Sequence, residues 1–164
     1  MAIVSGDIVY RLSGGASNSD PSLSIGGVKS SVSAGSNLFD ALTSAEAAAG
    51  DIEYRCFYVH NAHATLTMLS ARSFIPMNTS SPDTVLAIGV GAAAVNGTET
   101  AVANESTAPA GVTFSSPTDY ASGVALGDIP PGQHRAVWLR RTVTASAASA
   151  TDVSTVRTQC DTNP

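Results

Sequence analysis

Short apolar runs separated by polar turns dominate this chain, and the strongest run is IEYRCFYVH at residues 52–60. It is rich in β-branched and aromatic residues, which favours a strand because such side chains pack well on a pleated surface. One face would carry Cys56 and Tyr58, and the other face would carry Phe57 and Val59. Because both faces are partly apolar, we expect a central strand.

Seven further segments show weaker versions of this pattern. They are residues 7–12, 64–75, 84–90, 98–103, 111–114, 133–143 and 152–160. We expect residues 52–60 and 64–75 to pair as a hairpin or meander. Asn96-Gly97 is a tight-turn signal, so residues 98–103 would form the returning strand. Residues 152–160 would close the sheet.

Helical signals are confined to residues 43–49, TSAEAAA. Thr43 and Glu46 have the spacing of a capping box, and Gly50 would end the helix. Residues 128–132, DIPPG, form a turn with prolines that preset the backbone. Many short strands with almost no helix predict an all-β protein: a single β-sandwich or jelly-roll-like domain with one short connector helix.

The first 36 residues differ from the rest, because Gly and Ser dominate them around one possible strand. Such a composition buries little apolar area by itself. We therefore divide the chain into an extended N-terminal arm, residues 1–36, and a sandwich domain, residues 37–164. The arm is either flexible or an extended edge segment, and it could order against a neighbouring subunit. Residues 144–151 are expected to form a loop tip between the last two strands.

The composition limits the kinds of partner that this chain can bind. The chain has 164 residues, 13% charged and 43% hydrophobic, which fits one folded domain. The net charge is −5 and Lys29 is the only lysine, so no basic cluster exists to bind nucleic acid. No apolar run approaches the roughly 20 residues that span a bilayer. The N-terminus lacks the pattern of a secretory signal, so we expect assembly in a cytoplasm.

Three histidines, His60, His63 and His134, are the candidates for a metal site. Three imidazoles could make an open zinc site. However, residues i and i+3 on a strand point to opposite faces, and no acidic residue accompanies the histidines locally to orient them. We therefore interpret them as turn and strand-edge histidines and predict no metal ligands.

Other motifs with chemical meaning have simpler explanations. Residues 89–94, GVGAAA, match part of a dinucleotide fingerprint, but a turn follows where a helix would be needed. Cys56 falls mid-strand and is expected to be a buried hydrophobe, and we do not expect it to bond to Cys160. No GxSxG elbow occurs, and no pair of carboxylates stands out. We predict no catalytic residue, no cofactor and no enzyme activity.

Three segments carry a resemblance to known proteins: GDIEYRCFYVHN (50–61), LAIGVG (86–91) and LGDIPPGQHRAVWLRRTV (126–143). With the Ser/Gly-rich residues 13–31, they resemble small virion structural proteins of tailed bacteriophages. The resemblance covers about half the chain and includes no catalytic signature. It implies a β-sandwich that decorates or joins a particle.

The leading hypothesis is a capsid decoration (cement) protein, located in the virion, that binds across subunits of the major capsid protein. Many weak copies would together stabilise the shell. Self-association as a homotrimer would match local threefold positions of a capsid. Residues 1–36 would contact the shell, whereas Trp138 and Tyr58 would lie in the core. The alternatives are a tail, neck or baseplate protein and a carbohydrate-binding module that attaches the particle to cells.

Overall fold

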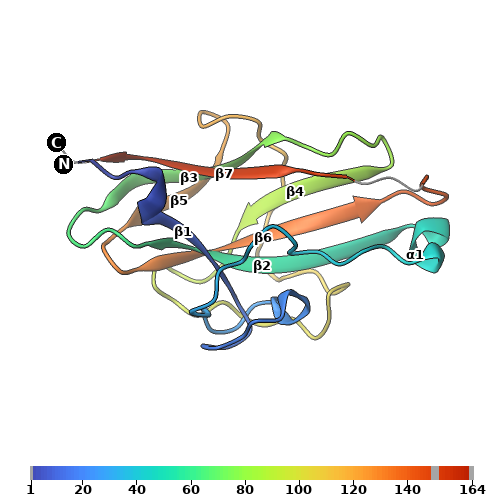
Figure 1. The fold of residues 1–164 in the computed structure, drawn as a ribbon, viewed down its shortest axis with the longest axis horizontal. Helices are drawn as coiled ribbons and strands as arrows, with labels where there is room; N and C mark the ends of the chain where they lie inside the picture. Colours follow the sequence, from blue (N-terminus) through green and yellow to red (C-terminus); the bar gives the residue numbers. More distant parts are fainter. Residues whose placement is uncertain (1, 149–151, 163–164) are drawn as a thin grey trace.

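A computed structural model of the protein describes residues 2–148 and 152–162. Seven strands form two sheets that face each other (Figure 1), which confirms the predicted all-β sandwich. The strands are β1 (Ile8–Leu12), β2 (Asp51–Asn61), β3 (Met68–Met77), β4 (Thr84–Val90), β5 (Val124–Ile129), β6 (His134–Val143) and β7 (Thr155–Thr162). The helical elements are η1 (Ser5–Asp7), η2 (Pro21–Leu23) and α1 (Ser44–Ala49).

The larger sheet has the order β1-β2-β6-β4 and the smaller sheet has the order β5-β3-β7, with every neighbouring pair antiparallel. The central position of β2 is confirmed, because it pairs with β1 on one side and β6 on the other. The hairpin expected between residues 52–60 and 64–75 is wrong, since β2 and β3 belong to different sheets. The alternation of apolar residues cannot distinguish a hairpin within one sheet from two strands in facing sheets, because the same face of each strand is buried in both arrangements.

Two further expectations about strands are wrong. Residues 98–103 and 111–114 form no strand; nearby, single bridges join Gly27 to Glu99 and Ile88 to Ser115. Their apolar side chains, Val102, Val112 and Phe114, instead pack onto the larger sheet from outside. Strand β5 was not predicted from the sequence, because Gly127 and Asp128 hide its pattern. Of the expected loop tip, residues 149–151 lie outside the described residues.

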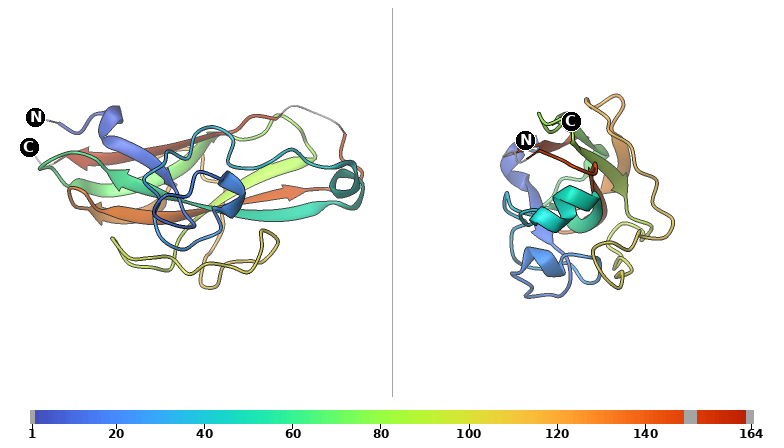
Figure 2. Two further views of the ribbon diagram at one scale, coloured as in Figure 1. Left: turned by 60° about the horizontal axis from the view of Figure 1, so that its bottom comes forward. Right: turned by 90° about the vertical axis from the view of Figure 1, so that its right-hand side faces the viewer.

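The protein has two apolar clusters on opposite faces of the larger sheet. Between the sheets lie side chains such as Phe57, Val59 and Val137. On the outer face lie five buried residues: Tyr54, Cys56, Tyr58, Ala136 and Trp138. Tyr58 and Trp138 have no exposed surface, so their predicted core location is confirmed. Loops cover this outer cluster and add a third layer to the sandwich (Figure 2).

The N-terminal segment is part of this layered body. Of the two readings of residues 1–36, the structure shows an extended edge segment at β1, which pairs with β2. The far side of β1 is covered in turn: the Leu12 N–H donates to the Val32 carbonyl, and the Ala34 N–H donates to the Tyr10 carbonyl, both at 3.0 Å. Beyond the end of β1, the Cys56 N–H of β2 donates to the Ser24 carbonyl at 2.6 Å.

The predicted connector helix is confirmed as α1, at the opposite end of the sandwich from the chain termini (Figure 1). The Thr43 hydroxyl accepts from the Glu46 N–H, and the Glu46 carboxylate accepts from the Thr43 N–H, which forms the expected capping box. Gly50 ends the helix with a φ of 79°, a conformation that glycine adopts without strain. Among the described residues, none of the helices has the length and apolarity to cross a membrane.

The Tyr58 hydroxyl ties two loops to the sheet, and this contact generates a prediction. It donates to the Gly27 carbonyl at 2.6 Å and accepts from the Glu99 N–H at 2.9 Å. Tyr58→Phe leaves both backbone groups without that partner, so we expect a loss of about 1–3 kcal/mol in the free energy of unfolding. Urea unfolding would measure it.

Tyr54→Phe is the matched control, because the Tyr54 hydroxyl makes no hydrogen bond within the described part of the chain and its ring lies in the same outer cluster. It should change stability by less than about 0.5 kcal/mol. Equal losses in the two variants would show that the Tyr58 hydroxyl does not hold the loops.

Candidate functional site

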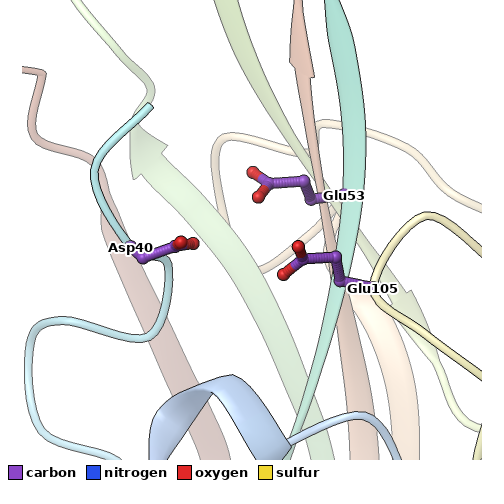
Figure 3. Close-up of side chains that lie close together, drawn as sticks. All are labelled: Asp40, Glu53 and Glu105. Carbon is purple, nitrogen blue, oxygen red and sulfur yellow. The ribbon is translucent and has the colours of Figure 1, made fainter. Parts of the chain in front are cut away.

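The densest group of acidic side chains lies near the start of β2, where Asp40, Glu53 and Glu105 converge (Figure 3). One oxygen from each carboxylate lies within 4.8 Å of the other two. Asp40 precedes α1, and Glu53 lies on β2. Glu105 lies in a loop beside β2, and its backbone carbonyl accepts a hydrogen bond from the Tyr54 N–H at 2.7 Å. Three converging carboxylates are a ligand set that hard divalent cations favour.

Two arginines already neutralise these carboxylates. Arg55 has no exposed side-chain surface; its Nη2 lies 3.2 Å from Asp40 Oδ1 and also pairs with Glu105. Arg141 pairs with Glu53, and its Nη2 lies 3.8 Å from Asp40 Oδ1. The Phe39 ring lies under both guanidinium groups, with centroid distances of 5.6 Å to Arg55 and 4.9 Å to Arg141.

The cluster therefore holds three carboxylates and two guanidinium groups. A divalent cation would have to displace at least one arginine whose charge already satisfies the carboxylates. Burial raises the pKa of Glu53, and the adjacent Arg141 opposes that rise. We assign the cluster to an ion-pair network that fixes the segment before α1 and the Glu105 loop to β2.

The structure brings together two of the three candidate histidines. His60 and His134 are direct partners in the β2–β6 register, and the Tyr58 ring meets the His134 ring edge to face at 4.8 Å. The Nδ1 atoms of both histidines are buried without a hydrogen-bond partner among the described residues. Burial lowers the pKa of both imidazoles, and the positive charge of Lys29 lowers them further.

His63 has a separate role. Its Nδ1 accepts from the N–H groups of Thr65 at 3.1 Å and Leu66 at 2.9 Å, so it caps the turn between β2 and β3. This matches the interpretation of His63 as a turn residue. Within residues 2–148 and 152–162, the three histidines do not converge as metal ligands, because Asp40, Glu53 and Glu105 form the one group of at least three potential ligands.

The two cysteines are free and differ in exposure. Cys56 is fully buried in the outer apolar cluster, and burial raises the pKa of its thiol well above the usual range. Cys160 is half-buried on β7, and burial raises its pKa as well. A buried thiol in apolar surroundings is inert, so Cys56 functions as a core residue.

The glycines of residues 89–94 are explained by close packing. A Cβ on Gly89 would lie 2.6 Å from the Thr113 carbonyl oxygen, and a Cβ on Gly91 would collide with the Glu99 carboxylate. Strand β4 ends at Val90, and a turn follows it. These glycines admit the covering loops to the sheet, where a dinucleotide site would need a helix.

Sequence reasoning missed most of the charged residues that organise the molecule. Glu99 is 3% exposed, and its carboxylate accepts from the Ala93 N–H at 3.0 Å. Glu53 and Arg55 lie on β2 at positions that alternate with the outer apolar cluster, and both are buried. The alternation of β2 was the available signal, because charged residues on a central strand require internal partners.

The chain was compared with protein-family models, with curated proteins and with solved structures, and none of them matches it.

The ion-pair network predicts an asymmetric mutational response. Arg141→Met leaves Glu53, whose side chain is 2% exposed, without its cation. We expect a loss of about 3–5 kcal/mol in the free energy of unfolding at neutral pH. Adding Glu53→Gln to Arg141→Met should recover part of that loss, because the buried charge is removed. If the double variant is no more stable than the single one in urea unfolding, Glu53 and Arg141 are not coupled.

The histidine pair predicts a dependence of stability on pH. The folded-state pKa of each imidazole lies below its ordinary value of about 6.5, so the unfolded chain binds more protons as the pH falls below that value. These two groups should therefore remove stability as the pH is lowered from about 7 to about 5. The double variant His60→Gln/His134→Gln should lose less stability over that interval than the wild type does, as measured by chemical unfolding at each pH. An unchanged pH slope would contradict this.

Proposed function

We propose that this chain is a structural protein of a tailed-bacteriophage virion, and that it decorates the capsid by binding across subunits of the major capsid protein. The resemblance of residues 50–61 and 126–143 to small virion proteins supports this proposal. Those segments correspond to β2 and to the end of β5 followed by β6, so they include the central strand pair of the sandwich. The proposal therefore concerns the body of the domain.

The observation that carries the proposal is that several of the reactive side chains serve internal structure. Cys56 is packed in an apolar cluster, Arg55 and Glu53 lie in an ion-pair network, and the His63 imidazole caps a turn. Catalysis needs such groups aimed at a site where a substrate can reach them. A scaffold that uses them to fix its loops fits a protein whose task is to present a rigid surface.

The physical mechanism would be multivalency. A single copy needs only a modest contact with the shell, because many copies on one particle add their contributions. The three-stranded sheet ends in the strands β5 and β7, and the longer of the two, β7, can add main-chain hydrogen bonds to a neighbouring protein. The proposed contact needs no cofactor and no chemical step.

The carbohydrate-binding alternative receives little support from the aromatic residues. Sugar platforms use exposed aromatic rings, but the four tyrosines, four phenylalanines and one tryptophan are all buried or half-buried. All nine lie in the described parts of the chain. The tail, neck or baseplate alternative uses the same fold and is separated from the head assignment by the experiment below.

The test is the location and copy number of the protein in purified particles of the phage that encodes it. Quantitative mass spectrometry would give its ratio to the major capsid protein, and immunogold electron microscopy would give its position. We expect labelling over the head and hundreds of copies per particle. Multiples of six or twelve copies with label on the tail would support the tail, neck or baseplate alternative. Absence from washed particles would contradict a virion role altogether.

A further inference from the structure

The two sheets differ in how their edges are covered. On the larger sheet, residues 30–34 cover β1, and Ser115 exchanges backbone hydrogen bonds with Ile88 of β4 at 2.8 and 3.0 Å. On the smaller sheet, β5 and β7 pair with β3 and with no other strand among the described residues. An uncovered strand edge is a template for another strand, and proteins usually protect such edges.

Strand β5 has such protection. Its pairing with β3 shifts register on both sides of Ala71, and Gly127 opposite has a φ of 80°. The Asp128 carboxylate reaches across to accept from the Ser70 N–H at 2.8 Å. An irregular edge with an inward-bonded acid is a poor template for a second strand.

Strand β7 is the longer of the two edge strands, with eight residues, and one side chain forms a hydrogen bond with its open edge. The Thr158 N–H donates to the Tyr10 hydroxyl at 2.9 Å, so this N–H points away from β3. Because N–H groups alternate along a strand, those of Val156 and Cys160 point to the same open side. A groove of about 310 Å³ follows this edge, lined by Ile3, Val4, Ser5, Ile8, Tyr10 and residues 157–160.

Two exposed residues on β7, Arg157 and Asp161, carry opposite charges. Val156, Thr158 and Cys160 turn toward the core, so Arg157 and Asp161 lie on the opposite, outward face. Neither residue forms a salt bridge among the described residues. Asp161 accepts a long hydrogen bond, 3.4 Å, from the Tyr120 hydroxyl. Four residues apart on one strand, they cannot meet each other.

We propose that β7 pairs antiparallel with β7 of a second copy of this chain, about a twofold axis at Gln159. In this register Arg157 lies directly opposite Asp161 of the second copy, and the symmetry produces the same pair twice. Thr158 lies opposite Cys160 of the second copy, and these two residues carry the outward N–H and carbonyl groups. This register therefore gives the outward backbone groups hydrogen-bond partners, and it gives each of the two charged side chains a partner of opposite charge.

Tyr10 regulates this pairing. In the single chain the Tyr10 hydroxyl accepts the hydrogen bond of the Thr158 N–H. In the dimer a carbonyl group of the incoming strand accepts this hydrogen bond in its place. The added strand also lies over the groove and covers Val4, which is 60% exposed. A strand pair buries less area than a standard interface, so the association is weak in solution. The twofold pair is independent of the virion assignment.

The experiment measures the mass of the full chain by sedimentation over a concentration series, under reducing conditions because Cys160 is half-buried. We expect a reversible monomer–dimer equilibrium. Arg157→Asp and Asp161→Arg each create two like-charge contacts in their own dimer, so each should weaken dimerisation about tenfold or more. Mixing the two variants restores both opposite-charge contacts, so the mixture should form a heterodimer about as tight as the wild-type dimer.

Tyr10→Phe provides a second variant that acts in the other direction. Without the hydroxyl, the Thr158 N–H has no partner in the monomer, so dimerisation should tighten several-fold. Lys29→Glu is the control for net charge, because Lys29 lies in the segment that follows β1 and belongs neither to β7 nor to the lining of the groove. It should leave the dimerisation constant unchanged, and circular dichroism should show the same fold for every variant.

Several results would overturn the proposal. One is a monomer at every concentration up to the solubility limit, and another is a trimer whose mass does not respond to these substitutions. A mixture of the two charge variants that fails to recover dimerisation would exclude this register. Because a homotrimer is the expectation from sequence, the measured mass separates the two assemblies directly.

Discussion

The pairing of β2 with β6 is the interaction on which the rest of the structure depends. Ten consecutive residue pairs join the two strands, and both faces of the pair are apolar. A two-layer sandwich covers only one of these faces. The other face carries Trp138 and Tyr58, and leaving such side chains in water would cost about 1.5–3 kcal/mol each. The fold therefore requires a third layer, and the loops provide it.

This requirement explains the unusual composition of the loops. A covering segment must approach the sheet closely and must find partners for its own backbone groups. Small residues permit the approach: the Ser13 hydroxyl donates to the Cys56 carbonyl at 2.9 Å, and Gly91 leaves space for the Glu99 carboxylate. A Gly/Ser-rich sequence that looks poorly suited to folding by itself is well suited to lying on a preformed sheet.

The local elements could be predicted from the sequence, but their arrangement could not. Strand β4 and the capped helix α1 were predicted at or within a residue of their bounds, because periodicity and capping are local signals. Sheet membership depends on which distant segment lies beside a strand, so β2 and β3 were wrongly paired. The ion-pair network was missed for the same reason, since Asp40, Arg55 and Glu105 meet only after the loops are placed.

The outcome is a molecule with one closed sheet and one open sheet. Loops that cover the outer apolar cluster also complete the edges of the larger sheet, as the Cys56 N–H to Ser24 contact illustrates. One structural solution therefore buries a hydrophobic face and removes two edges at once. Among the described residues, no second apolar cluster lies on the outer face of the smaller sheet; Tyr120 and its neighbours contact β3 there through Ser70 and Arg72, and they leave the edge of β7 without a paired strand. The uneven distribution of apolar side chains thus determines which side of the protein is available to other chains.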